Sequence, residues 1–581
     1  MSADTNTDTE PNRQPSASDT PGAGSDAFSD EIADRTEGIA AASAFGVDTR
    51  AIMDAWLSIA NEATTHPRAV LRAATKLGRE LGSIVMGSSE LAPAPEDKRF
   101  SDAAWEANPI FRRIGQSYVA WTRSLDGWLD ESGLEGIERE RARFVLDVFK
   151  DVLAPVNSLA GNPEALKKLR ASDGGSLTRG LKNFLDDLRH NHGYPAVADR
   201  HAFKVGKDVA CTRGAVVYRN ELFELIQYRP TTPEVSPVPV LYVFSQVNRF
   251  YLGDLTPDRS LFKRLLDAGI PVFAISWRNP TVEERDWNLD TYADGVITAI
   301  TVMQQITKQP KIHLMGLCAG GLVAAAAAGV LAARREDWIS TLSLFVNVLD
   351  YRPGDSEFGL FVSERSVDAQ KAVVRGRGVF AERDVFEMFA LLRMEENVMS
   401  FFRSNYLMGE EPLKHPLLFW SMDYTRVPAE MQCDFLNLAQ YNKLAKKEMR
   451  ILGKRVDLTR IDYPVYVMAG TTDHITPWKA CFRSTQLFGG DVAFVLTNQN
   501  HTQTISSRED NRHLKHWVVD NPSDNPDRAM RLATEHEGSW TRHWIGWLDD
   551  HSGERVKAPR RMGSGKNPIL GEAPGLYVLE S

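Results

Sequence analysis

A cysteine stands in the middle of a glycine-rich turn, Gly-Leu-Cys-Ala-Gly-Gly at residues 316–321. The apolar run 311–316 predicts a strand before it, and the alanine-rich run 322–333 predicts a helix after it. A nucleophile between glycines at a strand-to-helix turn is typical of a nucleophile elbow, whereas an isolated cysteine is more often a small buried apolar residue. The three glycines, Gly316, Gly320 and Gly321, favour the elbow, because a side chain there would crowd a tight turn.

A nucleophilic thiol needs a base and an acid that orients the base, and after an elbow these follow in the order acid, base. Asp473 comes after the strand-like run 463–470, and His501 comes after the run 491–497. Each alone would more often be a loop-capping carboxylate or a surface imidazole. Parallel sheets place their sites beyond the carboxyl ends of strands, so the joint placement predicts a triad of Cys318, His501 and Asp473.

Two neighbours compete for these roles. Asp350 ends the preceding strand-like run and is a second possible acid, while His474 adjoins Asp473. Oxyanion donors are expected from two backbone N–H groups: that of Ala319 at the start of the helix, and one from the loop 246–248 after the run 238–245.

Six short runs rich in β-branched residues alternate with helical patterns from about Val209 onward. This alternation predicts a mainly parallel sheet with helices on both faces. Together with the elbow and the order of the triad, it indicates an α/β-hydrolase fold. The predicted strands are 238–245, 271–277, 311–316, 341–349, 463–470 and 491–497.

Three stretches fall outside this alternation. Residues 1–29 are polar and predict a disordered leader, and residues 30–206 show helical spacing that predicts an N-terminal helical domain. Within a catalytic domain of residues 207–581, the aromatic-rich region at about 350–450 predicts an inserted lid over the site. Its large apolar residues, Phe401, Phe402 and Trp420, are more often core than binding surface.

Composition excludes several classes of function. The 581 residues carry 68 basic and 77 acidic side chains, a formal charge of -9, so nucleic acid is not an expected partner. The four cysteines have no metal-ligand spacing, so neither a disulfide framework nor a zinc site is expected. The run 322–333 is too short to cross a bilayer, and the N-terminus lacks a signal pattern. We therefore expect a soluble, cytoplasmic protein.

The motif at 316–321 resembles the lipase-box-like motif of polyhydroxyalkanoate synthases, in which cysteine replaces serine. The resemblance extends from about residue 45 to the end, and the chain length is similar to that of the long, single-subunit synthases. The matching segments are VNRFYLGDL (247–255), SWRNP (276–280), DWNLDTY (286–292), DHITPW (473–478), WEANPIFRRIGQSY (105–118), LAPVNSLAGNPEALKKL (153–169) and EAPGLYVLE (572–580).

The resemblance implies roles for individual residues. Cys318 would be the acylated nucleophile, with His501 as base and Asp473 as acid, and the N–H groups of Val247 and Ala319 would form the oxyanion hole. Two positions depart from the family pattern. Asn500 stands where a glycine usually precedes the histidine, and Phe244 with Ser245 stands where a proline-rich segment is common.

The implied activity is polymerisation of 3-hydroxyacyl-CoA, with 3-hydroxybutyryl-CoA as the expected monomer, into a polyester with release of CoA. No metal or redox cofactor is expected. The resemblance also implies a homodimer formed through the lid region and attachment to polymer granules. Two alternatives stay open: an intracellular polyester depolymerase or thioesterase, and a catalytically inactive granule-associated subunit.

Overall fold

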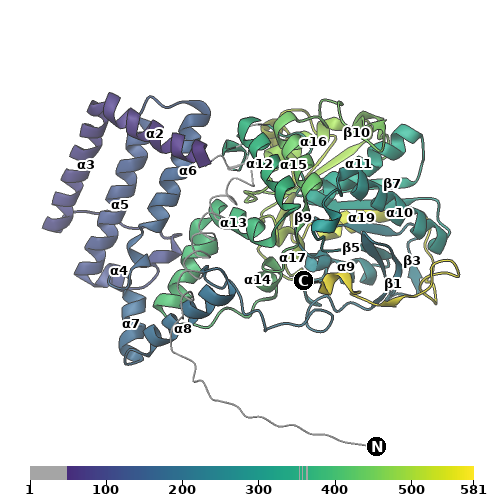
Figure 1. Ribbon diagram of the computed structural model, residues 1–581, viewed down its shortest axis with the longest axis horizontal. Coiled ribbons are helices and arrows are strands. Elements are labelled where there is room, and N and C mark those ends of the chain that lie inside the picture. The colour runs from purple at the N-terminus through teal and green to yellow at the C-terminus, as the bar shows by residue number, and fades with distance from the viewer. Residues whose placement is uncertain (1–48, 353, 356–357, 362–363, 581) are drawn as a thin grey trace, which may run out of the picture.

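The computed structural model describes residues 49–352, 354–355, 358–361 and 364–580. The predicted leader at residues 1–29 lies outside the described residues. Figure 1 shows a helical body next to a larger body built around a sheet.

From Thr49 to His190 the described chain forms helices joined by turns. Two of these helices begin with the same device, because Asn108 and Asn162 each accept a backbone N–H at the first turn and a proline follows directly. The helices are α2 (Thr49–Thr65), α3 (Pro67–Met86), α4 (Ala104–Ala107), α5 (Pro109–Asp130), α6 (Gly136–Val152), α7 (Pro163–Ala171) and α8 (Gly175–His190).

The larger body contains an eleven-stranded sheet with the order β15-β14-β13-β12-β7-β6-β4-β5-β2-β1-β17. The six predicted strands lie next to one another at its centre and are all parallel, which confirms the predicted mainly parallel sheet. They are β4 (Val240–Val243), β5 (Val272–Trp277), β6 (Ile312–Leu317), β7 (Ile339–Phe345), β12 (Val465–Gly470) and β13 (Val492–Thr497).

Antiparallel strands extend the sheet on both sides, a feature that the sequence did not individually predict. They are β1 (Gly214–Arg219), β2 (Phe223–Tyr228), β14 (Lys515–Asp520), β15 (Thr534–Glu537) and β17 (Gly571–Glu572).

Apolar side chains of the central strands alternate between two buried clusters, one on each face of the sheet. In β5, Phe273 and Ile275 belong to one cluster, while Val272 and Ala274 belong to the other. The first cluster packs against α10 (Leu289–Thr307) and α11 (Ala319–Arg334), and the second packs against α9 (Leu261–Asp267) and α19 (Thr541–Asp550). The strands are therefore buried on both sides, as their nearly continuous apolar sequence requires.

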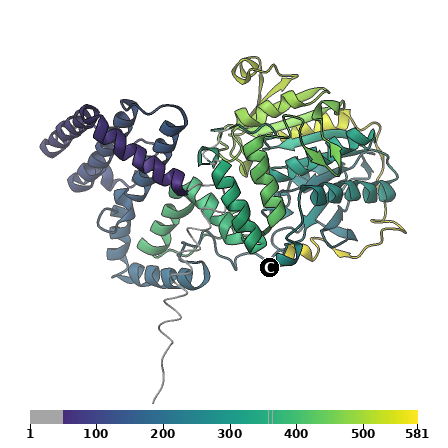
Figure 2. The same cartoon turned by 45° about the horizontal axis from the view of Figure 1, so that its top comes forward.

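The segment between β7 and β12, which we call the lid segment, contributes no strand to the main sheet within its described residues. Its short strands pair only with each other, β8 (Val379–Phe380) with β9 (Val427–Pro428) and β10 (Arg450–Ile451) with β11 (Lys454–Arg455). Its described helices are α12 (Glu364–Arg377), α13 (Glu382–Leu392), α14 (Pro416–Ser421) and α15 (Ala429–Tyr441). It also has two π-helical turns, η6 (Glu395–Met399) and η7 (Phe402–Leu407), and two 3₁₀ turns, η5 (Phe358–Phe361) and η8 (Leu458–Arg460). In Figures 1 and 2 the green helices of the lid segment lie between the helical body and the sheet.

Among the described residues, no helix is long and apolar enough to cross a membrane.

Candidate active site

Cys318 occupies the turn between β6 and α11 with a positive φ, its backbone angles being φ 54° and ψ -131°. A residue other than glycine at positive φ is strained, and it persists only where the surroundings hold it. The Cys318 N–H donates to the carbonyl of Phe345 at 3.0 Å, and the Cys318 carbonyl accepts the N–H of Gly321 at 2.9 Å. This is the backbone geometry of a nucleophile elbow.

The three glycines of the turn allow very close packing. A Cβ on Gly316 would lie 2.5 Å from the Cα of Gly321, and one on Gly320 would lie 2.4 Å from the carbonyl oxygen of Val243. A Cβ on Gly321 would lie 2.7 Å from Cγ of Asn347. These distances are shorter than any carbon side chain tolerates, so the strand, the turn and the helix meet with no room for a Cβ.

Asn347, in the loop after β7, fixes the turn from the other side. Its buried side chain donates from Nδ2 to the Cys318 carbonyl at 2.7 Å. Sequence reasoning missed this residue, because an asparagine after a strand carries no signal of what its side chain reaches.

His501 and Asp473 form a hydrogen-bonded pair, with Nδ1 of the imidazole 2.7 Å from Oδ2 of the carboxylate. The other carboxylate oxygen accepts the N–H groups of Ile475 at 2.9 Å and Thr476 at 2.8 Å. The hydroxyl of Thr476 donates to Oδ2 at 2.7 Å. The Asp473 side chain is fully buried, so these bonds supply the partners that water would otherwise provide.

The electrostatics of the pair follow from its neighbours. Burial alone would lower the pKa of His501, but the charges of Asp473 and Cys318, with hydrogen bonds to both side chains, raise this pKa well above its ordinary value. Burial alone would raise the pKa of Asp473, but His501 and the Thr476 hydrogen bonds lower it. The structure thus brings the three predicted residues, Cys318, His501 and Asp473, into one interacting group.

Asp350 and His474, the two competing candidates, have different surroundings. The Asp350 carboxylate accepts from Nδ2 of Asn442 at 2.7 Å and pairs with Arg352 at 3.1 Å, so it is engaged away from the imidazole. His474 lines the same cavity as Cys318. Burial, with the nearby charge of Arg393, lowers the pKa of His474 to about 4, which leaves it neutral at pH 7.

The loop 246–248 is attached to the lid segment. The N–H and hydroxyl of Thr425 donate to the carbonyls of Val247 at 3.1 Å and Gln246 at 2.7 Å. The Val247 N–H has only a long bond, 3.3 Å, to the hydroxyl of Ser245. Both Val247 and Cys318 line the same cavity, and Ala319 is the first residue of α11, where helix N–H groups lack helical partners.

A cavity of about 360 Å³ lies over Cys318, with Val247 and His501 in its wall. Phe401 and Trp420 line it as well, so their interpretation as core residues was incomplete, whereas Phe402 packs on Tyr406 with ring centroids 5.5 Å apart. Asn500, at the departure from the family pattern, also lines it. The lid segment supplies most of the apolar wall: Phe386, Phe401, Leu417, Trp420, Met422 and Tyr424.

The described residues contain neither a cluster of metal ligands nor a disulfide. Across the described ranges, no group of three or more His, Cys, Asp and Glu side chains could hold a metal ion. The four cysteines are free thiols, and Cys481 donates to the carbonyl of Thr476 at 3.3 Å behind the His501–Asp473 pair.

Comparison with known proteins identifies the family. Residues 96–265 match the model described as Poly-beta-hydroxybutyrate polymerase (PhaC) N-terminus, and residues 251–502 match the alpha/beta hydrolase fold. The chain is 37% identical over 538 residues to Poly(3-hydroxyalkanoate) polymerase 1 of Ectopseudomonas oleovorans, covering 92% of this chain and 96% of that protein. It belongs to the poly(3-hydroxyalkanoate) polymerase family.

A second relative in the polymerase family is the Poly(3-hydroxyalkanoate) polymerase subunit PhaC of Cupriavidus necator, 33% identical over 500 residues and covering 85% of this chain and 84% of that protein. Among solved structures, a monoacylglycerol lipase of Paleococcus ferrophilus aligns with 57% of this chain and 100% of its own, at 16% identity and a TM-score of 0.31. A TM-score that low supports no statement about activity.

The packing of the elbow in this polymerase predicts the effect of Gly320→Ala. The new Cβ would meet the Val243 carbonyl, so we expect a loss of about 1–3 kcal/mol of folding free energy from overpacking. CoA release should fall about a hundredfold, because the sulfur is displaced. Thermal unfolding and thioester kinetics measure the two effects. Gly82→Ala in α3, where a Cβ would have no neighbour within 4 Å, is the control. It should keep the wild-type rate and be as stable as the wild type or more stable by up to about 1 kcal/mol, because alanine favours a helix.

Asp473→Asn tests the charged pair through the pH dependence of stability. The raised pKa of folded His501 contributes stability that is complete below its unfolded value of about 6.5 and is lost as the pH rises through the folded value. The lowered pKa of Asp473 contributes stability above about 3.9 that is lost as the pH falls through its folded value. The difference in melting temperature between wild type and variant should therefore be largest between about pH 4 and 6.5. A difference that is the same at every pH would contradict the pairing.

Proposed function

We propose that this chain polymerises 3-hydroxyacyl-CoA, with 3-hydroxybutyryl-CoA as the expected monomer, into a polyester with release of CoA. The observation that carries this proposal is a cysteine at a nucleophile elbow, next to a buried His501–Asp473 pair, in a mainly apolar cavity closed by the lid segment. Membership of the polymerase family supports the substrate class.

In the proposed first step, Cys318 attacks the thioester. Asp473 holds Nδ1 of His501 at 2.7 Å, which leaves Nε2 free to take the thiol proton. The Cys318 sulfur bonds to the acyl carbon, the bond from that carbon to the CoA sulfur breaks, and the proton on His501 passes to the leaving thiolate. The N–H groups of Val247 and Ala319 are proposed to stabilise the oxyanion, since the Val247 N–H is only weakly engaged in the free structure.

In the second step, the acyl group passes from sulfur to oxygen. His501, oriented by Asp473, takes the proton of a 3-hydroxyl group from the chain or from an incoming monomer. The hydroxyl oxygen bonds to the acyl carbon as the thioester bond breaks, so the polyester gains one unit and a thiol is restored. A thiol nucleophile suits this reaction because exchange between two thioesters keeps the chain activated.

Water is the competing acceptor of the acyl group. The lid segment lines the cavity with aromatic and aliphatic side chains, and its Thr425 also binds the loop 246–248. We propose that this apolar lining excludes water from the acyl-enzyme, so that transfer to a hydroxyl is faster than hydrolysis. Because the thioester is already activated and no atom changes oxidation state, the proposal uses no metal or redox cofactor.

The assembly and location of the protein are proposed from the family resemblance. We propose a homodimer formed through the lid region, in the cytoplasm and attached to polymer granules. Sedimentation of the purified chain and fractionation of granules from polymer-producing cells test these two points.

Cys318→Ala should abolish the reaction. We expect CoA release from 3-hydroxybutyryl-CoA to fall by about a thousandfold or more, because no acyl-enzyme can form. Mass spectrometry of wild-type protein mixed briefly with substrate should show a hydroxyacyl adduct on the peptide that contains Cys318. Equal rates for both proteins would identify an inactive granule-associated subunit, and CoA release with free hydroxy acid but no polymer would identify a depolymerase or thioesterase.

The length of the monomer is tested with 3-hydroxyacyl-CoAs of graded length. The cavity over Cys318 is about 360 Å³ and must hold the acyl group next to the bound thioester. We expect kcat/KM to be highest for the four-carbon monomer and to fall by at least about tenfold for the eight-carbon one, since a bounded apolar pocket discriminates on this scale. CoA release and chromatography of the depolymerised product measure it, and a higher value for the longer monomer would contradict this choice.

A further inference from the structure

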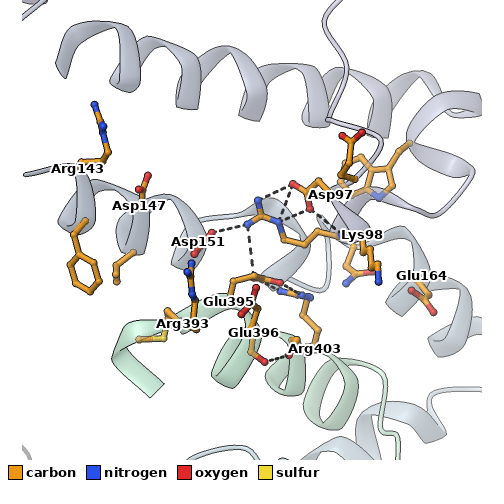
Figure 3. Close-up of a pocket in the computed structure, with 18 of the residues that line it drawn as sticks. Asp97, Lys98, Arg143, Asp147, Asp151, Glu164, Arg393, Glu395, Glu396 and Arg403 are labelled. Carbon is orange, nitrogen blue, oxygen red and sulfur yellow. Dashed lines mark hydrogen bonds and ion pairs between the residues drawn. The ribbon is translucent and has the colours of Figure 1, made fainter. Parts of the chain in front are cut away.

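Part of the lid segment separates two cavities. One is the catalytic cavity, whose wall includes Asn397 and Phe401. The other, of about 900 Å³, opens between the N-terminal helices and the lid segment, and Figure 3 shows Glu395 and Arg403 on the lid side of it. Glu396 lines both cavities. Residues 395–408 therefore form a wall with the N-terminal helices on one side and the catalytic cavity on the other.

Charged side chains join this wall to the N-terminal helices. Nη1 of Arg403 donates to Oε2 of Glu395 at 3.0 Å and to Oδ1 of Asn157 at 2.7 Å. Arg99, which is bonded to Asp151 at 2.9 Å, lies 3.9 Å from Oε2 of Glu395. The cluster is partly shielded from water, since the side chains of Arg403, Arg99 and Glu395 are 11%, 18% and 20% exposed. Ion pairs in such surroundings are screened less than surface pairs.

A second contact, on α8, holds the same wall through backbone carbonyls and through a tyrosine hydroxyl. Asn183 donates to the carbonyls of Asn405 at 3.0 Å and Glu410 at 2.8 Å, and Tyr406 donates to Asp187 at 2.9 Å. The approach is so close that a Cβ on Gly180 would lie 1.9 Å from the Tyr406 carbonyl oxygen.

The wall itself is irregular, since η6 and η7 are π-helical turns. A π-helical turn is rare and poorly stabilised by its own hydrogen bonds, so it depends on neighbouring elements for its shape. Four of its polar contacts come from the N-terminal region: Asn183 and Asp187 lie on α8, and Arg99 and Asn157 lie in short turns that join the helices. Asn405 of the wall also donates to the carbonyl of Ala196, just beyond α8, at 2.8 Å.

We propose that the N-terminal helices position this wall of the catalytic cavity, with Glu395, Arg403 and Gly180 as positioning residues for the reaction. The helices hold residues 395–408 against the cavity over Cys318, and so keep water from the acyl-enzyme. The part of this inference that concerns water rests on the proposed function, whereas access to the Cys318 thiol does not.

The first test inserts a methyl group between α8 and the wall. Gly180→Ala must push Tyr406 away, while Gly78→Ala in α3, where a Cβ would have no neighbour within 4 Å, is the matched control. The rate at which iodoacetamide alkylates Cys318, followed by mass spectrometry, measures access to the cavity. We expect alkylation to be severalfold faster in Gly180→Ala and unchanged in Gly78→Ala.

The second test removes the charged contact. Arg403→Met loses the bonds to Glu395 and Asn157, and Arg143→Met is the control, because Arg143 lines the same outer cavity but pairs with Asp130 and Glu140 of its own domain. Arg403→Met should speed alkylation of Cys318 severalfold and raise the ratio of free 3-hydroxy acid to CoA released. Arg403→Lys keeps the charge but not the planar fork, so it should show a smaller change in the same direction.

The outcomes separate the inference from the proposed function. Folded Gly180→Ala and Arg403→Met proteins, with circular dichroism like the wild type, that alkylate at the wild-type rate would overturn the positioning role. If Arg403→Met does not fold, an unchanged alkylation rate in Arg403→Lys overturns it. If the wild type releases no CoA, the proposed function fails, and the alkylation rates still decide whether the helices hold the wall.

Discussion

The site depends on the close packing around Cys318. A positive φ at a cysteine is unfavourable, and it is held here because β6, β7 and α11 meet at positions where no Cβ fits. Gly320 touches the end of β4 at the Val243 carbonyl, so the same contact that holds the sulfur also sets the start of the loop that carries Val247. The nucleophile and the candidate oxyanion donors are therefore placed by one rigid junction of the sheet.

The acid and base are placed by a different principle. Asp473 and His501 follow neighbouring parallel strands, β12 and β13, whose register aligns their carboxyl ends. The Asp473 carboxylate is buried and accepts hydrogen bonds from two backbone N–H groups and one hydroxyl. These bonds fix its orientation independently of the imidazole. The raised pKa of His501 and the lowered pKa of Asp473 are both consequences of this arrangement.

The sequence predicted those parts of the molecule that depend on local pattern. The six central strands follow from β-branched runs, and the grouping of Cys318, Asp473 and His501 follows from their order after strand ends. The antiparallel strands at the sides of the sheet escaped individual prediction for two reasons: β17 has only two residues, and charged or polar residues such as Glu224 in β2 and Lys515 in β14 interrupt the apolar pattern of the longer ones. Asn347, Thr425 and Thr476 were missed for another reason: each acts through a side-chain contact whose partner is fixed only by the tertiary fold.

The contact between the N-terminal helices and the lid segment is the strongest case of this kind, since Asn157 and Arg403 are 246 residues apart in sequence. Neither residue type nor spacing indicates that they meet. Under the role proposed for the N-terminal helices, this contact affects which acceptor receives the acyl group. An elbow, a base and an acid can deliver an acyl group to water or to a hydroxyl, and the choice rests on which acceptor reaches the thioester. We propose that the N-terminal helices, by holding these π-helical turns against the catalytic cavity, favour the hydroxyl over water.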